Sequence, residues 1–159
     1  MIESTRYYSI YRKVAALIEE GKSLERDYSS EWEYAHMSSA AQIGRILAVR
    51  RGVDPEIAAI ACLLHDIGRI VTGRQHEHAA NGAQPARSVL EEFFPPAIIE
   101  EIVTAVVRHG RKDETGGPIE EIVKDADVLD CALYGLSFEK EGFRLRLKKL
   151  AEELGISSL

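Results

Sequence analysis

The sequence predicts an all-α protein. Apolar residues recur every three to four positions along each long segment, and no stretch alternates apolar and polar residues between turn signals. At 159 residues the chain has the size of one domain and is long enough to bury a core without disulfides. We therefore expect a single domain over residues 1–159, built as a bundle of about six to seven helices.

Capping residues mark the first two helices. The first is expected over residues 5–20, with Gly21 just past its end, where a left-handed cap is easiest for glycine. The second begins at Ser30, whose hydroxyl can cap the helix while Glu33 reaches back, and it ends at Gly52.

The third helix has the clearest start. Asp54 can act as its N-cap, and Pro55 fits the first helical position, where a missing N–H costs nothing. The helix is apolar nearly all round as far as Leu64, which is typical of a helix buried on several sides. Residues that follow Leu64 should therefore lie in the middle of the protein, and Gly68 permits another backbone to approach there.

The second half of the chain continues the helical pattern. Residues 72–82 are polar and are expected to form a loop, and prolines end the next helix at residue 95. Three more helices are expected at about 96–109, 118–134 and 138–154. The last one, from Phe138 to Leu154, is strongly charged and should cover one side of the bundle.

Composition limits the possible partners. The net charge of −6 argues against binding to nucleic acid polymers, whose affinity comes from basic surface, but a small phosphorylated substrate needs only local cations. The start of the chain lacks the apolar core of a signal peptide, and the longest apolar run, residues 57–64, is shorter than the roughly 20 residues that cross a bilayer. Cys62 and Cys131 have apolar neighbours and predict no disulfide and no thiolate metal site. We therefore expect a cytoplasmic protein without membrane partners.

Imidazoles and carboxylates occur on the inward faces of several predicted helices. His36 lies on the core side of the second helix, and His65 and Asp66 end the most buried one. His109 continues an apolar stripe, and Asp127 also faces inward. One such histidine alone is more often a hydrogen-bonded core residue. The whole set indicates a metal site, because an ion neutralises buried carboxylates and satisfies imidazoles together.

The order of these residues resembles a known family. The sequence looks like the HD superfamily of metal-dependent phosphohydrolases, of the HDIG type. The resemblance lies in the order of His36, then LLHDIGR with His65 and Asp66, then KDADVLD with Asp127. The resemblance implies an all-α, HD-domain-like fold. It also implies that up to six residues ligate one or two metal ions, with Asp66 as the bridge: His36, His65, Asp66, His78, His109 and Asp127.

His78 has a competitor in the same loop. His76 lies two residues earlier, and either histidine could reach the second ion. Mixed imidazole and carboxylate ligands suit Mn, Fe, Co, Ni or Zn. A bound divalent ion lowers the pKa of its water from about 15.7 to about 7, which supplies hydroxide for attack on phosphorus.

Positive side chains near the centre would hold the remaining phosphate charge. Arg69 is the first candidate, followed by Arg74, Arg108 and Lys124, and together with Asp66 we expect Arg69 and Lys124 to act in catalysis. Arg108, Arg111 and Lys112 are equally well explained as a solvated helix end with a favourable dipole.

Asp130, one turn after Asp127, could support a metal ligand or be a surface acid. The resemblance favours hydrolysis of a phosphomonoester or phosphodiester, with a nucleotide or another small phosphorylated metabolite as substrate. A di-iron oxygenase of the same superfamily and a non-catalytic nucleotide-binding sensor are the alternatives. A homodimer is also compatible with the short chain.

Overall fold

The regular structure of the chain is helical, as the sequence predicts. The computed structural model describes residues 5–136 and 139–157, and within them there is no strand. Seven of the helices described have eight residues or more: α1 (Arg6–Glu20), α2 (Ser30–Arg51), α3 (Pro55–Leu64), α6 (Ala83–Leu90), α7 (Pro96–Arg108), α8 (Pro118–Leu133) and α9 (Glu141–Leu154). Shorter pieces are the 3-10 turn η2 (Gly21–Ser23), α4 (Ile67–Thr72) and α5 (His78–Asn81).

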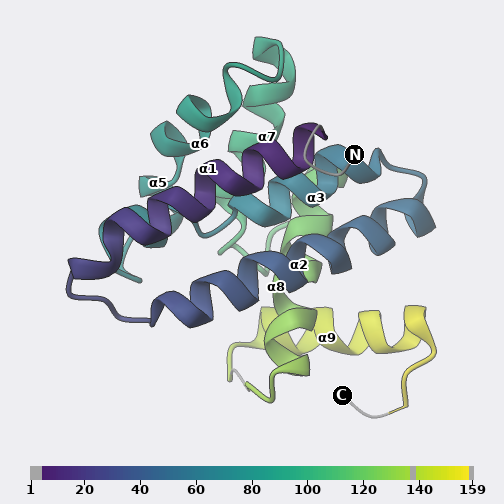
Figure 1. The fold of residues 1–159 in the computed structure, drawn as a ribbon. Coiled ribbons are helices and arrows are strands. Elements are labelled where there is room, and N and C mark those ends of the chain that lie inside the picture. The colour runs from purple at the N-terminus through teal and green to yellow at the C-terminus, as the bar shows by residue number, and fades with distance from the viewer. Residues whose placement is uncertain (1–4, 137–138, 158–159) are drawn as a thin grey trace.

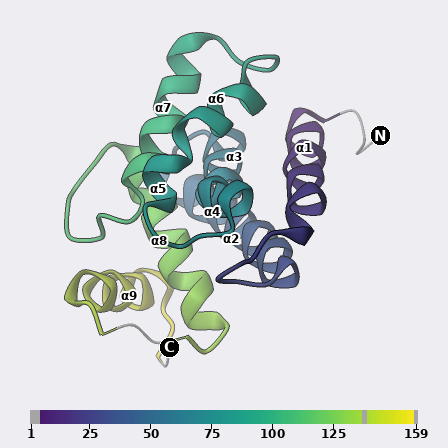
Figure 2. The same ribbon diagram turned by 90° about the vertical axis from the view of Figure 1, so that its left-hand side faces the viewer.

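Helix α3 forms the centre of the bundle. All its residues from Ala58 to Leu64 are buried, and it packs against α1, α2, α7 and α8. The views in Figures 1 and 2 place α9 at the end of the molecule opposite α6 and α7. In Figure 2, α4 is seen along its axis near the middle of the molecule. The segment that follows α3 therefore lies in the interior, as its apolar sequence predicts.

The caps of α2 and α3 give one correction and one confirmation. The side chain of Asp54 accepts hydrogen bonds from the backbone N–H groups of Glu56 (2.8 Å) and Ile57 (3.1 Å), which confirms the predicted start of α3. The predicted cap of α2 is wrong by one residue. Ser29 is the N-cap, and its hydroxyl accepts from the N–H of Trp32 at 3.2 Å. Glu33 does not reach back, because its carboxylate is buried against Arg69.

Two short helices occupy the region between α3 and α6. The chain leaves helical geometry at Asp66 (φ −100°, ψ 14°) and resumes it in α4. Residues 72–82 were expected to form a loop, but helix α5 lies inside this stretch, so that prediction is wrong. A Cβ built on Gly68 would lie 1.9 Å from the carbonyl oxygen of His78 and 2.6 Å from the nitrogen of Gly82. The close backbone approach expected at Gly68 is confirmed, and it presses α4 against α5.

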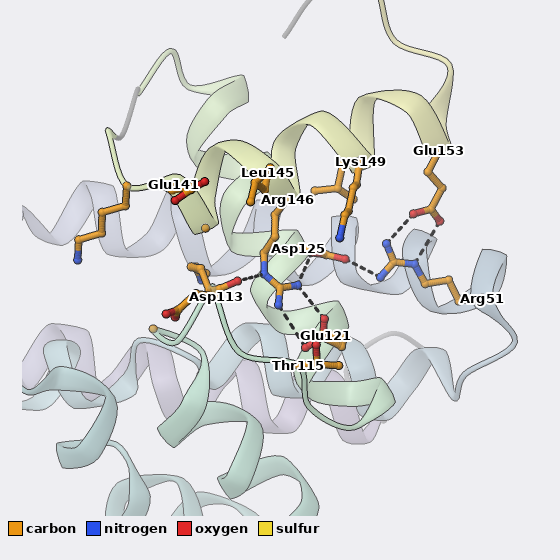
Figure 3. Close-up of a pocket in the computed structure, with 15 residues that line it drawn as sticks. Arg51, Asp113, Thr115, Glu121, Asp125, Glu141, Leu145, Arg146, Lys149 and Glu153 are labelled. Carbon is orange, nitrogen blue, oxygen red and sulfur yellow. Dashed lines mark hydrogen bonds and ion pairs between the residues drawn. The ribbon is translucent and has the colours of Figure 1, made fainter.

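Helix α9 covers one side of the bundle, as predicted. The predicted helix start, Phe138, lies outside the described residues, and the helix as described begins at Glu141. Ion pairs fasten α9 to its neighbours (Figure 3), with Arg51 of α2 2.6 Å from Glu153 and Arg146 2.9 Å from Asp125 of α8. Among residues 5–136 and 139–157, no helix has the length and apolarity that a membrane span requires.

Candidate metal centre

Five parts of the fold contribute side chains to one buried cluster. Helix α2 supplies one histidine, the break between α3 and α4 supplies a histidine and an aspartate, α8 supplies an aspartate, and α5 and the end of α7 each supply a histidine. The structure thus brings together the six residues that the sequence suggests as metal ligands: His36, His65, Asp66, His78, His109 and Asp127.

One group of ligand atoms surrounds His36. Its Nε2 lies 3.0 Å from His65 Nε2, 3.3 Å from Asp66 Oδ2 and 3.4 Å from Asp127 Oδ1. His65 Nε2 is also 3.2 Å from Asp66 Oδ2. Two imidazole nitrogens and two carboxylate oxygens therefore converge on one point.

A second group gathers around the other oxygen of Asp66. Its Oδ1 lies 3.1 Å from His78 Nε2 and 3.5 Å from His109 Nε2, and these two nitrogens are 3.0 Å apart. Since Oδ2 belongs to the first group, Asp66 has the arrangement of a bridging ligand. The side chain of His76 is 89% exposed and its ring faces Glu77, so of the two competing histidines His78 is the one in the cluster.

Hydrogen bonds at Nδ1 fix the four imidazoles. The acceptors are Asp130 Oδ2 for His36 (2.6 Å), and backbone carbonyls for His65 (Cys62, 2.7 Å), His78 (Gln75, 2.7 Å) and His109 (Val106, 2.6 Å). A neutral imidazole that donates from Nδ1 presents a lone pair at Nε2. Asp130 is only 1% exposed and accepts from the candidate ligand His36, so it is not a surface acid.

The buried carboxylates of the cluster raise the pKa values of two of its histidines. Burial opposes protonation of His36, but hydrogen bonds to Asp127, Asp130 and Asp66 outweigh it and raise its pKa to about 12. Burial likewise opposes the charged form of His65, whose pKa Asp66 and Asp127 raise to about 9.

The pKa values of Asp66, Asp127 and His109 are lowered. Burial opposes ionisation of Asp66, yet the charges of His65 and Arg69 hold its pKa well below the ordinary value. Burial likewise opposes ionisation of Asp127. The charge of Lys112 and hydrogen bonds from His36 and His65 hold the pKa of Asp127 well below the ordinary value. Burial lowers the pKa of His109 to about 4, so His109 stays neutral.

These donors fit divalent transition metal ions. Neutral imidazoles and carboxylates pointing lone pairs at one another about 3 Å apart repel, unless a cation lies between them. The triads His36–His65–Asp127 and His65–Asp66–His109 each place three ligand atoms within 4.8 Å of one another. No thiolate takes part, which matches the ligand chemistry of Mn, Fe, Co, Ni or Zn.

A cavity of about 190 Å³ opens over the cluster. Part of its wall is apolar and is formed by Tyr28, Trp32 and Phe143. The ring of Trp32 stacks on His36 at 5.1 Å between centroids. The cavity thus joins the metal ligands to a surface suited to an organic group. A larger groove of about 690 Å³ lies beside it, along α9.

Arg69 lines the cavity, but most of its hydrogen-bond donors are occupied. Its guanidinium bonds both carboxylate oxygens of Glu33 (2.9 and 3.0 Å), Asp66 Oδ2 (2.5 Å) and Gln75 (2.9 Å), and it stacks on Tyr28. The geometry suits orientation of Asp66. Glu33, which sequence reasoning read only as a cap, completes this arrangement.

The structure does not bring Lys124 to the site. Its side chain is fully buried, and its Nζ donates to the carbonyl of Glu114 (2.8 Å) and to Glu121 (3.2 Å). Lys124 does not line the cavity over the cluster, and its bond to Glu114 stabilises the loop before α8. The expected catalytic role of Lys124 is therefore corrected to a structural contact.

The cation that the structure does bring to the centre is Lys112. Its Nζ lies 2.5 Å from Asp127 Oδ2 and 2.8 Å from the carbonyl of His109. From the sequence, Lys112 is explained equally well as part of a solvated helix end, but its side chain is only 13% exposed and pairs with a candidate ligand. The other candidate cations pair with acids away from the cluster, Arg74 with Glu25 and both Arg108 and Arg111 with Glu114.

The fold and the clustered imidazole and carboxylate groups define a helical domain with a candidate metal centre. The chain belongs to the HD domain family, whose model matches residues 34–132 and so spans all six candidate ligands.

Known proteins agree with this assignment. Ribonuclease Y of Borreliella burgdorferi is 30% identical over 122 residues, covering 74% of this chain and 22% of that protein. Ribonuclease Y of Acetivibrio thermocellus is 29% identical over 150 residues, covering 93% of this chain and 27% of its own length. The chain thus spans about a quarter of these relatives.

One solved structure shares the fold. It is that of a predicted HD superfamily hydrolase from an uncultured Thermotogales bacterium, with a TM-score of 0.57 and 24% sequence identity. The alignment covers 91% of this chain and 88% of the other.

Proposed function

We propose that the chain is a metal-dependent phosphohydrolase that acts on a nucleotide or another small phosphorylated metabolite. The observation that carries the proposal is the convergence of four imidazole lone pairs and two carboxylates at the base of a cavity. Divalent ions would neutralise the carboxylates and satisfy the imidazoles together, and the set lies where a substrate can reach it.

The two groups of ligands would hold two ions. His36, His65 and Asp127 would bind one, His78 and His109 the other, and Asp66 both. An ion bound there supplies a water molecule whose pKa falls from about 15.7 to about 7 and withdraws charge from phosphoryl oxygens. Asp130 and the carbonyl partners at Nδ1 keep the imidazoles aimed at that position.

The cavity favours a small substrate. Its volume of about 190 Å³ accepts a phosphoryl group and the atoms next to it, whereas typical ligand pockets enclose about 300–1,000 Å³. Trp32, Tyr28 and Phe143 would exclude water and contact the organic part of the ester. The rest of a nucleotide would extend outside.

The names of the relatives suggest a second substrate class. Both ribonuclease Y proteins carry a name that implies cleavage of RNA. The net charge of −6 opposes a long polyanion, since such affinity depends on displaced counterions. A short RNA belongs in the substrate panel for this reason.

The test combines metal analysis with a panel of phosphomonoesters, phosphodiesters, nucleotides and a short RNA. We expect hydrolysis of at least one small ester with Mn, Fe, Co, Ni or Zn, its loss on chelation, and its loss in Asp127→Ala. His76→Ala, which changes an exposed histidine outside the cluster, is the control and should keep activity.

Three results would point elsewhere. Cleavage of the RNA alone would replace the small-metabolite proposal. Consumption of oxygen by the iron-loaded protein without any hydrolysis would favour the di-iron oxygenase. Tight nucleotide binding without turnover would favour the sensor.

A further inference from the structure

Lys112 lies between the metal cluster and the groove along α9. It lines both the cavity of about 190 Å³ and the groove of about 690 Å³, and its side chain is 13% exposed. Its Nζ carries three donors, and the structure uses two of them, for Asp127 and for the carbonyl of His109. Among the residues that the structure describes, the third N–H has no acceptor, which leaves it for a ligand in the cavity.

The two carboxylate oxygens of Asp127 face different partners. Oδ1 lies 3.4 Å from His36 Nε2 within the cluster, and Oδ2 accepts from Lys112. A phosphoryl group held at the metal centre would therefore come within reach of the ammonium. Arg69 cannot substitute easily, because its guanidinium is bonded to Glu33, Asp66 and Gln75.

Arg146 of α9 fixes the backbone that carries Lys112. Its Nε donates to the carbonyl of Lys112 at 2.7 Å, and a terminal nitrogen donates to the carbonyl of Glu114 at 3.0 Å. Figure 3 shows the guanidinium pointing from α9 toward Asp125 and Glu121 of α8, which anchor it at 2.9 Å each.

Helix α9 also packs closely on this loop. A Cβ built on Gly142 would lie 2.9 Å from the nitrogen of Asp113 and 3.0 Å from the carbonyl carbon of Lys112. The backbone that carries Lys112 is thus held by α9, a helix that follows the 34–132 family match in the chain.

We propose that Lys112 contacts a non-bridging oxygen of the substrate's phosphoryl group and that Arg146 is the positioning residue that holds it there. The proposal rests on the proposed phosphohydrolase function and deepens it. It assigns recognition of the phosphoryl charge to the loop between α7 and α8. The neighbouring groove along α9 would receive the part of the substrate that extends out of the cavity.

A purely structural role for Lys112 predicts something different. If Lys112 only orients Asp127, its replacement lowers metal affinity, while protein that is fully loaded with metal binds phosphate as before. The two roles therefore separate when phosphate binding is measured at saturating metal.

The experiment measures binding of inorganic phosphate to the metal-loaded protein by isothermal titration calorimetry. The proteins are wild type, Lys112→Met, Lys112→Arg, and the control Lys148→Met, which alters an exposed lysine of α9 that lines neither cavity. Metal content is measured in each, so that affinities are compared at equal occupancy.

We expect Lys112→Met to weaken phosphate binding about tenfold to a hundredfold, the usual effect of one charge-assisted hydrogen bond. Lys112→Arg should recover part of the loss, and Lys148→Met should match the wild type. Equal phosphate affinity in Lys112→Met and wild type would overturn the proposed role of Lys112 and leave the phosphohydrolase proposal standing. Failure of the metal-loaded wild type to bind phosphate or hydrolyse any ester would overturn the phosphohydrolase proposal, and this one with it.

Discussion

At the residue scale, the centre is organised by the hydrogen bonds behind its ligands. Each of the four imidazoles is held at Nδ1, so its Nε2 faces the other donors. In the metal-free protein, protons on His36 and His65 supply the positive charge that the carboxylates need. A metal ion must replace those protons.

This exchange predicts a pH dependence of metal binding. The pKa values of His36 (about 12) and His65 (about 9) lie above the ordinary 6.5, so both rings are protonated at pH 7. Because metal ligation requires neutral imidazoles, apparent affinity should rise with pH by roughly tenfold per unit for each proton released. The stabilisation that these protons give the metal-free fold is complete below pH 6.5 and is lost as pH rises through the raised values.

Calorimetric titration with metal in buffers of different ionisation enthalpy counts the protons released. We expect about two near pH 7. Binding that releases none and has the same affinity between pH 6 and pH 8 would contradict the account of His36 and His65.

At the element scale, the break between α3 and α4 places the site. It turns His65 and Asp66 toward His36, and the following helix brings Gly68 against the backbone of α5, whose first residue is His78. The second group of ligands therefore depends on how closely α4 and α5 pack.

Replacing Gly68 with Ala tests this dependence. The added Cβ would overlap the His78 carbonyl at 1.9 Å, and backbone atoms can yield only by moving α5. We expect a loss of stability of at least about 1–3 kcal/mol, the usual range for overpacking, and a loss of one metal equivalent. Thermal unfolding and metal analysis measure the two effects.

Gly117→Ala is the matched control, because a Cβ there meets only Glu120 at 3.8 Å. Because Gly117 is the N-cap of α8, where Ala is less favourable than Gly, the change should cost about 0.5–1.5 kcal/mol and leave the metal content unchanged. A Gly68→Ala protein with wild-type stability and metal content would show that the close packing of α4 on α5 does not position His78.

The elements differ in how far the sequence predicts them. Asp54 and Pro55 mark the start of α3 correctly, because capping chemistry is local. Helices α4 and α5, six and four residues long, were not predicted, because such short pieces show no helical period and depend on tertiary packing. At α2, two adjacent serines offered the same cap, and burial of Glu33 against Arg69 was not visible in the sequence.

At the scale of the whole molecule, the site joins residues from 36 to 127 along the chain. Inward-facing positions on helices could be predicted from periodicity, and the six clustered ligand positions follow from it together with the family resemblance. The residues that contact the ligands from outside could not be predicted from the sequence. Pairs such as Lys112 with Asp127, and Arg146 with the Lys112 carbonyl, depend on how loops and α9 pack.

The central claim is a centre that holds two metal ions, with Asp66 shared between them. Its most direct test is the metal stoichiometry of purified protein at saturating metal, measured by inductively coupled plasma mass spectrometry. We expect two equivalents in the wild type and in His76→Ala, one in His109→Ala and His78→Ala, and a lower content in His65→Ala and Asp127→Ala, which lose a ligand of the first group. A single equivalent in the wild type that persists unchanged in His109→Ala would contradict the two-ion centre and leave His109 as a hydrogen-bonded core histidine.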